Sequence, residues 1–201
     1  VRSVSEHPGD STGNPLRVDW LETADLSVTG AIGRTFLPGK NHHGVSGLLH
    51  ARSAALDCER LRQVYGTDTL VLLNEDHEIA RFVNDVPPPA GPQDLVAELA
   101  RQEIELLRLP IPDGGTPSAE QLPEVRRLLA KVIERLRTGS TVAVACRGGL
   151  GRTGTILALA LRELGCNADE AVRRVRRMNA SCIEREGQEA FVRSWAPAMG
   201  L

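Results

Sequence analysis

The chain contains few aromatic residues, 3% of its 201 positions, so its core must be built mostly from aliphatic side chains. Its length and its 41% of hydrophobic residues suffice for one domain with a substantial core. It also lacks a strong charge of one sign. A formal net charge of -2 gives no general basic field that would attract nucleic acid or a membrane surface. No apolar run reaches the roughly 20 residues that a membrane-spanning helix needs.

Cysteine and metal-ligand motifs are equally sparse. The cysteines stand at positions 58, 146, 166 and 182, at irregular spacing and without a C-x-x-C pair. This usage is typical of free thiols in a reducing compartment, so we expect a cytoplasmic protein. The five histidines show neither H-E-x-x-H nor a matching carboxylate spacing, so no metal site is predicted. No feature indicates an organic cofactor or an oligomeric state.

The first 15 residues are polar, carry two glycines and two prolines, and lack the apolar stretch of a signal peptide. They predict a flexible arm over residues 1–15 before a single domain over residues 16–201. In that domain, apolar segments that suit strands alternate with segments of helical periodicity. The expected strands are 17–21, 31–37, 69–73, 104–109 and 141–145, and the expected helices are 52–65, 76–84, 93–102, 118–137, 151–164, 168–178 and 185–195. This alternation predicts an α/β fold with a central, mostly parallel sheet flanked by helices.

The segment between the last expected strand and the helix after it carries the clearest chemical signal. It runs Cys146-Arg147-Gly148-Gly149-Leu150-Gly151-Arg152-Thr153-Gly154. Glycines in such a turn let successive backbone N–H groups converge on one point, and the helix N-terminus adds partial positive charge. We therefore predict a phosphate-binding loop made of Arg147, Gly148, Gly149, Leu150, Gly151 and Arg152.

Two side chains of this loop have the chemistry to react with a bound phosphate. Arg152 can fold back over the loop and hold two oxygens of an anion with its planar guanidinium. The same surroundings favour the thiolate of Cys146, because they lower a cysteine pKa from about 8.5 into the range of about 3.5–7.5. The segment thus combines a phosphate cradle with an ionised nucleophile aimed at phosphorus.

Other interpretations of the same segment compete with this one. Residues 149–154 match the dinucleotide fingerprint G-x-G-x-x-G, which requires a second strand after the helix. Residues 168–178 carry four arginines at helical spacing, and they do not suit a buried strand. The Walker phosphate loop ends in G-K-[ST], and here Arg152 stands in place of the lysine. A purely structural turn is the remaining alternative.

The stretch from Cys146 to Thr153 matches C-x5-R-[ST], so the chain resembles the protein tyrosine phosphatase superfamily. The segments Leu37-Pro38-Gly39 and Pro110-Ile111-Pro112-Asp113-Gly114-Gly115-Thr116-Pro117 make it similar to the dual-specificity branch, and within that branch to the kinase-associated phosphatases. The resemblance covers roughly residues 30–195. It implies the cysteine-phosphatase fold and hydrolysis of a phosphomonoester through a phosphocysteine on Cys146, without a metal or an organic cofactor.

The resemblance also implies roles for residues beside the nucleophile. Asp113, on a loop with Pro112 before it and two glycines after it, would protonate the leaving oxygen and later activate water. An Asp-Gly turn without a catalytic role is the alternative. Thr153 would hydrogen-bond the thiolate and help to hydrolyse the intermediate. Gln188 would steady water or substrate near the loop, unless it is a solvated helix residue.

Two histidines in an early loop, His42 and His43, are candidate substrate contacts, although surface histidines without a role are common. The substrate is expected to be a phosphorylated protein, the default of the family, or a small phosphorylated metabolite. One position departs from the family pattern, because Ala145 stands where a histidine usually precedes the nucleophile. A phosphate-binding or repurposed member with weak or altered catalysis is therefore a further alternative.

Overall fold

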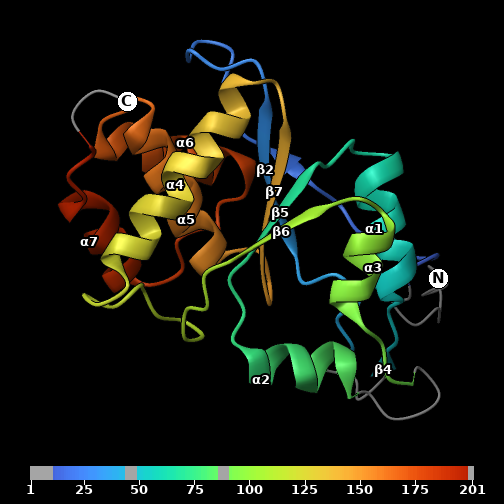
Figure 1. Ribbon diagram of the computed structural model, residues 1–201. Helices are drawn as coiled ribbons and strands as arrows, with labels where there is room; N and C mark the ends of the chain where they lie inside the picture. The colour runs from blue at the N-terminus through green and yellow to red at the C-terminus, as the bar shows by residue number, and fades with distance from the viewer. Residues whose placement is uncertain (1–10, 44–48, 86–90, 199–201) are drawn as a thin grey trace, which may run out of the picture.

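The computed structural model describes residues 11–43, 49–85 and 91–198, and its centre is a five-stranded sheet (Figure 1). The strands are β1 (Asp19–Trp20), β2 (Ala31–Phe36), β5 (Thr69–Leu72), β6 (Glu105–Arg108) and β7 (Thr141–Cys146). Their order in the sheet is β1-β2-β7-β5-β6. β1 pairs antiparallel with β2, and the other neighbours pair in parallel. The predicted α/β fold with a mostly parallel sheet is confirmed.

Helices cover both faces of the sheet (Figure 1). One face carries α4 (Leu122–Arg137), α5 (Gly151–Glu163), α6 (Ala168–Met178) and α7 (Glu186–Ser194), and the other carries α1 (Ala54–Gln63) and α3 (Leu95–Arg101). A short helix, α2 (Asp76–Ile79), continues into one π-helical turn, Ala80–Asn84, at the lower end of the sheet in this view. Two-residue strands β3 (His42–His43) and β4 (Leu49–His50) pair antiparallel.

Strand side chains alternate between two aliphatic cores. Along β7, Val142, Val144 and Cys146 pack with the α4–α7 layer, whereas Ala143 and Ala145 pack with the α1–α3 layer. This follows from the period of two along a strand, and from the rule that parallel sheets are buried on both faces. The side chain of Cys146 and that of its neighbour at position 145 therefore lie on opposite sides of the sheet.

Element boundaries depart from the sequence expectations where turns compete with regular structure. The helix expected over 118–137 begins at Leu122, because a turn comes first in which the Gln121 N–H donates to the Ser118 carbonyl (3.1 Å). The strand expected over 17–21 is reduced to the two residues of β1. The helix starts are better marked: the Asn167 side chain accepts from the Glu170 N–H (2.9 Å) and opens α6 as a cap.

Part of the expected N-terminal arm is held against the domain. The Ser53 N–H donates to Ser11 Oγ (3.0 Å), and the Arg52 guanidinium donates to the Asn14 carbonyl (2.7 Å). Residues 1–10 lie outside the described residues. The described end of the arm thus contacts the start of α1.

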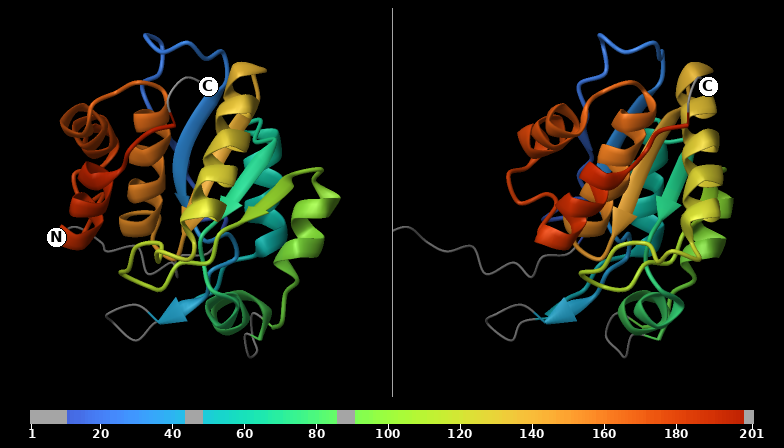
Figure 2. Two further views of the ribbon diagram at one scale, coloured as in Figure 1. Left: turned by 60° about the vertical axis from the view of Figure 1, so that its left-hand side comes forward. Right: turned by 90° about the vertical axis from the view of Figure 1, so that its left-hand side faces the viewer.

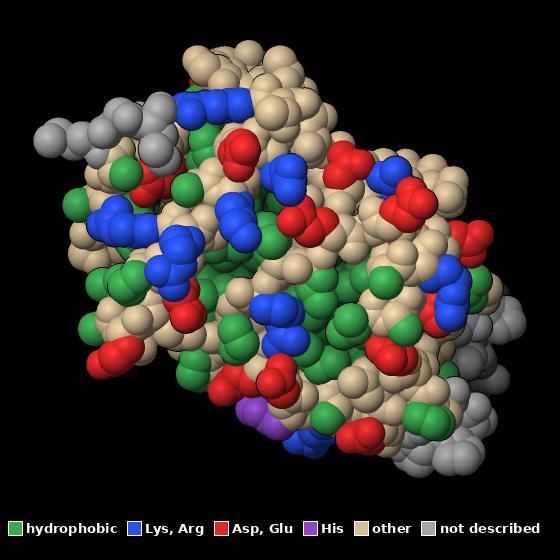
Figure 3. Space-filling view, viewed as in Figure 1, with side chains coloured by type: hydrophobic (Ala, Val, Ile, Leu, Met, Phe, Trp, Pro, Cys, Tyr) green, Lys and Arg blue, Asp and Glu red, His purple; other side chains and the backbone are tan. Residues whose placement is uncertain are grey.

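The surface and its charges agree with the near-zero net charge. On the face shown in Figure 3, basic and acidic side chains are interspersed. Within the described ranges, no helix has the length and apolar character needed to cross a membrane. The same residues contain no group of three or more His, Cys, Asp or Glu side chains placed to hold a metal ion.

Candidate active site

The carboxyl ends of the four parallel strands meet at one edge of the sheet, where open α/β sheets bind ligands. Figure 2 shows the connections that follow these strands gathered at this edge. β2 leads to Lys40, β5 to Glu78, β6 to Asp113 and β7 to the loop that starts at Cys146. Segments far apart in sequence are brought together because each follows a strand of the same sheet.

Cys146 is the last residue of β7, and 3% of it is exposed. Three residues later the chain turns at Gly149, whose φ of 71° lies in the region that favours glycine. A Cβ atom at Gly149 would overlap the carbonyl oxygen of Thr35, so the loop packs directly on the backbone of β2. Arg34 Nη1 donates to the Gly149 carbonyl (2.9 Å) and fixes the loop from its outer side.

The loop keeps its backbone donors available for an anion. In the part of the chain that the structure describes, no N–H group of residues 147–150 donates a hydrogen bond. Helix α5 begins at Gly151, so its partial positive charge points at the same place. A Cβ atom at Gly151 would lie 2.5 Å from Glu184 Oε2 and 2.9 Å from the Gln188 amide nitrogen, so these two side chains would have to shift to admit a larger residue. This arrangement suits a bound phosphate.

Arg152 folds back from the first turn of α5 into the centre of the site, and 1% of its side chain is exposed. Its Nη1 donates to Glu78 Oε2 (2.6 Å) and to the Ile111 carbonyl (2.8 Å). Its Nη2 donates to Glu78 Oε1 (2.8 Å) and to Asp113 Oδ1 (3.0 Å). Burial lowers the pKa of Arg152, but hydrogen bonds to Glu78 raise it more, so the guanidinium is a permanent cation.

Glu78 is a site residue to which the sequence pattern assigned no role. It lies on α2, is 4% exposed, and holds both terminal nitrogens of Arg152. Burial alone raises the pKa of the Glu78 carboxyl. The hydrogen bonds that Arg152 and the Glu75 backbone donate to it lower the pKa by more, so the pKa lies below its ordinary value of 4.5. Because the pKa is lowered on folding, the pair adds stability above pH 4.5, which is lost as the pH falls through the folded value. Glu78 therefore fixes the orientation of the guanidinium.

Asp113 lies on the loop after β6 and contacts both arginines of the phosphate loop. Its Oδ1 pairs with Arg152 Nη2 (3.0 Å), and its Oδ2 pairs with Arg147 Nη1 (3.0 Å). Its side chain is 46% exposed, so solvent reaches it. Gly114 follows in a left-handed conformation, with a φ of 73°. The structure therefore places the candidate acid at the mouth of the loop.

Gln188 joins α7 to the loop that carries Asp113. It is 1% exposed, its amide nitrogen donates to the Gly115 carbonyl (3.1 Å), and its Oε1 accepts from the Arg185 N–H (3.3 Å). It is therefore a buried residue beside the site, not a solvated helix residue. A contact between Gln188 and substrate stays a prediction.

The remaining candidates are less defined by contacts. Thr153 is fully buried, and within the described residues its hydroxyl has no hydrogen-bond partner, so it is free to bind a group held in the loop. His42 and His43 form β3, but their side chains lie outside what the structure describes. Their contact with substrate remains a prediction.

Comparisons with known proteins agree with this site. Residues 67–165 match the family model Tc-R-P, described as a DSP-PTPase phosphatase of polymorphic toxin systems. This range contains Asp113 and the whole loop from Cys146. Mouse cyclin-dependent kinase inhibitor 3 is 27% identical over 151 residues, which are 75% of this chain and 64% of that protein. The chain is similar to cysteine-based phosphatases of the dual-specificity type. It spans slightly less than two thirds of the mouse relative.

Solved structures show the same similarity at the level of the fold. A crystal structure of kinase-associated phosphatase, in which serine replaces the catalytic-site cysteine, has a TM-score of 0.74 at 20% identity and covers 89% of this chain and 93% of that one. The structure of Tk-PTP in its active form has a TM-score of 0.57 at 28% identity, and the match covers 83% of this chain and 92% of that one. The predicted cysteine-phosphatase fold is thereby confirmed.

Ala145 faces away from the anion site. It is fully buried in the apolar cluster on the α1–α3 side, which also contains Leu37 and Leu72. Its carbonyl accepts a hydrogen bond from the Leu73 N–H (2.9 Å). Backbone pairing with the chain after β5 therefore holds this end of β7 without any polar side chain at position 145.

Proposed function

We propose that the chain hydrolyses phosphomonoesters through a phosphocysteine intermediate on Cys146. The observation that carries this proposal is the position of Arg152, which folds back over a loop with unused backbone donors and contacts Asp113 (3.0 Å). Nucleophile, oxyanion donors and acid thus come from a single edge of the sheet. Each is a group that phosphoryl transfer through a thiolate requires.

In the first step the thiolate of Cys146 attacks phosphorus, forming a sulfur–phosphorus bond. The bond between phosphorus and the ester oxygen breaks, and Asp113 gives its proton to the departing oxygen. The backbone N–H groups of the loop and the guanidinium of Arg152 hold the other three oxygens while charge redistributes over them. The alcohol leaves, and the phosphoryl group stays on sulfur.

In the second step a water molecule attacks the phosphorus of the intermediate. Asp113, now a carboxylate, takes a proton from this water as the new oxygen–phosphorus bond forms. The sulfur–phosphorus bond breaks and returns Cys146 as a thiolate, which the unpaired hydroxyl of Thr153 is free to stabilise. Inorganic phosphate then departs.

Asp113 must change partners before it acts as the acid. In the structure its carboxylate accepts a hydrogen bond from Arg152 Nη2, a donor that a phosphate oxygen would use. An incoming phosphate competes for this donor and places negative charge beside Asp113. Loss of the cation and approach of a like charge both favour proton uptake by a carboxylate. Substrate binding thus prepares the acid.

The relatives point to a phosphorylated substrate, and we propose a phosphorylated protein as the family default, with a small phosphorylated metabolite as the rival. A cytoplasmic location is proposed because the four cysteines at positions 58, 146, 166 and 182 are free thiols. A binding module without turnover is the remaining alternative. Release of p-nitrophenol from p-nitrophenyl phosphate separates it from an enzyme.

Replacing Asp113 with asparagine removes the acid while keeping the size of the side chain. We expect the rate on phenyl phosphate, a poor leaving group, to fall by about 100-fold to 10,000-fold, the usual contribution of a general acid. The loss on p-nitrophenyl phosphate should be much smaller, because that leaving oxygen needs little protonation. The alkaline limb of the pH–rate profile should flatten, since it reports deprotonation of this acid.

A matched control is Asp76→Asn, at the start of α2 near the same edge of the sheet, where 90% of the side chain is exposed. This variant should keep both rates and the shape of the profile. Equal losses on the two substrates in the Asp113 variant would show that Asp113 does not act as the acid.

A further inference from the structure

Three cationic side chains from three separate segments gather beside the phosphate loop. Lys40 follows β2, Arg81 lies in the π-helical turn after α2, and Arg147 belongs to the loop itself. The Phe82 ring joins two of them, because its centroid lies 5.2 Å from the guanidinium carbon of Arg81 and 5.9 Å from that of Arg147. The Asn41 N–H donates to the Phe82 carbonyl (2.8 Å), so the turn that contains Lys40 lies against the segment that carries Arg81 and Phe82.

Lys40 is close enough to the loop to respond to its charges. Its Nζ lies 5.6 Å from the centroid of the Phe36 ring. Burial lowers the pKa of Lys40, the positive charges of Arg147 and Arg52 lower it further, and the negative charge of an ionised Cys146 raises it. A cation crowded by like charges is stabilised by an added anion.

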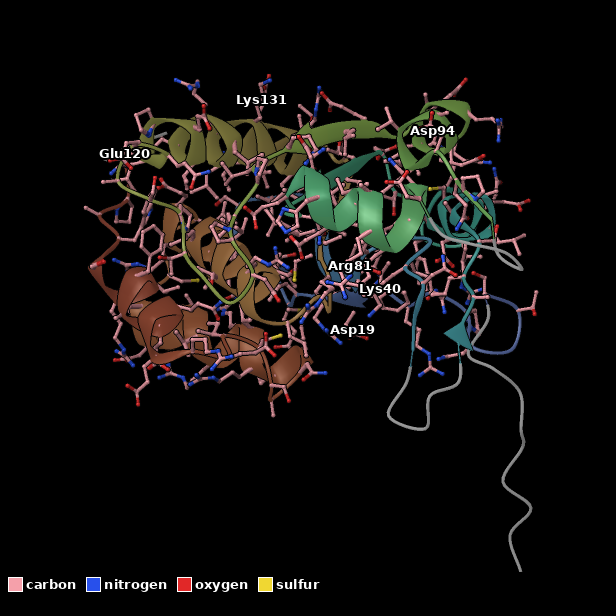
Figure 4. All side chains as sticks on the ribbon, turned by 90° about the horizontal axis from the view of Figure 1, so that it is seen from below. Asp19, Lys40, Arg81, Asp94, Glu120 and Lys131 are labelled. Atoms are coloured by element: carbon pink, nitrogen blue, oxygen red, sulfur yellow. The ribbon has the colours of Figure 1, made fainter. Side chains whose placement is uncertain are left out.

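The described residues supply little negative charge to balance these cations. Among them, neither Lys40 nor Arg81 forms an ion pair with an acidic side chain. Figure 4 looks onto this edge of the sheet and shows Lys40 and Arg81 near each other in the middle of the view. Asp19, the labelled acid nearest to them there, is paired with Arg34 at 2.6 Å.

Arg147 does have an acidic partner, Asp113, but that is the carboxylate which phosphate displaces in the proposed mechanism. We propose that Lys40, Arg81 and Arg147 form a second anion site, which binds a second phosphate-like group of the substrate. The inference rests on the proposed function, because the first phosphate must occupy the loop. The preferred substrate is then a phosphomonoester that bears a further dianionic group within reach of these three cations.

Equilibrium binding to the Cys146→Ser protein tests the site without turnover. Phenyl phosphate is compared with 3-(phosphonomethyl)phenyl phosphate, which adds one dianionic group that cannot be hydrolysed. We expect the second ligand to bind at least about tenfold more tightly, the effect of one charge-assisted contact. Lys40→Gln and Arg81→Gln, each in the same background, should bring the ratio of the two dissociation constants toward one.

Lys131→Gln is the matched control, because it removes the same charge from α4 at the margin of the face in Figure 4. It should leave the ratio unchanged. A ratio near one in the starting protein, or a ratio that neither Lys40→Gln nor Arg81→Gln lowers, would overturn the second site. Using a ratio cancels any general loss of phosphate binding in a variant.

A second arm distinguishes the source of the second anion. Phosphotyrosine peptides with and without a neighbouring phosphothreonine are compared in the same way. A preference for the doubly phosphorylated peptide assigns the site to phosphoproteins, and a preference shown only for the small ligand assigns it to metabolites. Both outcomes support the site.

Turnover is judged separately from binding at the second site. If the wild-type chain fails to release p-nitrophenol while the binding ratio holds, the proposed hydrolysis fails and the second site stands.

Discussion

Replacing Cys146 with serine should abolish turnover and leave oxyanion binding in place. A serine hydroxyl is not ionised near neutral pH, so it is a much weaker nucleophile than the thiolate that the proposed mechanism requires. The rate of phosphate release should fall by at least about 1,000-fold. The backbone donors and Arg152 are untouched, so tungstate should still bind with nearly the wild-type dissociation constant in calorimetry.

The matched control is Cys58→Ala, which changes a buried thiol on α1 in the cluster on the other side of the sheet. It should retain the wild-type rate per folded molecule. Substantial phosphatase activity in the Cys146→Ser protein would sink the covalent mechanism.

Replacing Arg152 with lysine should be far from conservative, although it keeps the charge. The guanidinium binds Glu78 with two nitrogens, and lysine offers one compact ammonium group instead. We expect turnover to fall by about 100-fold or more, as for loss of an oxyanion donor. Weakening a buried ion pair should also lower the free energy of unfolding, by up to about 3 kcal/mol. Steady-state kinetics and urea unfolding measure the two effects.

Glu78→Gln separates the two roles of the arginine. It weakens the same buried pair, so it should lower stability, but it leaves Arg152 in place and should preserve tungstate binding. If Arg152→Lys showed wild-type kinetics, the guanidinium would not be holding the transferred phosphoryl group.

The loop was predictable from the sequence because its parts are local. Glycines, nucleophile and arginine lie within nine residues, and a strand and a helix flank them, so the spacing alone indicates a cradle for an anion. Arg152 lies where that pattern requires. The sheet was also predictable, since its buried strands are short apolar runs such as Thr69–Leu72.

Glu78 was not predictable, because its role depends on a contact 74 residues away in sequence. It sits in a short helix among other acidic residues, and no periodic pattern distinguishes it from a solvated carboxylate. Its one signal is its place just after a buried parallel strand, at the edge where α/β proteins bind ligands. Lys40 and Arg81 were not predictable for the same reason, since they follow two different strands, β2 and β5, and reach a loop that follows a third, β7.

The direct test of the account is to trap the intermediate. The protein is mixed with substrate, denatured rapidly in detergent during turnover, digested, and examined by mass spectrometry. Burial raises the pKa of Cys58 to about 12 and that of Cys182 to about 11, so these thiols stay protonated near neutral pH. We predict one phosphoryl group on the peptide that contains Cys146, and none in the Cys146→Ser protein. Turnover with no phosphoryl group on Cys146, or with one on another residue, would contradict the account.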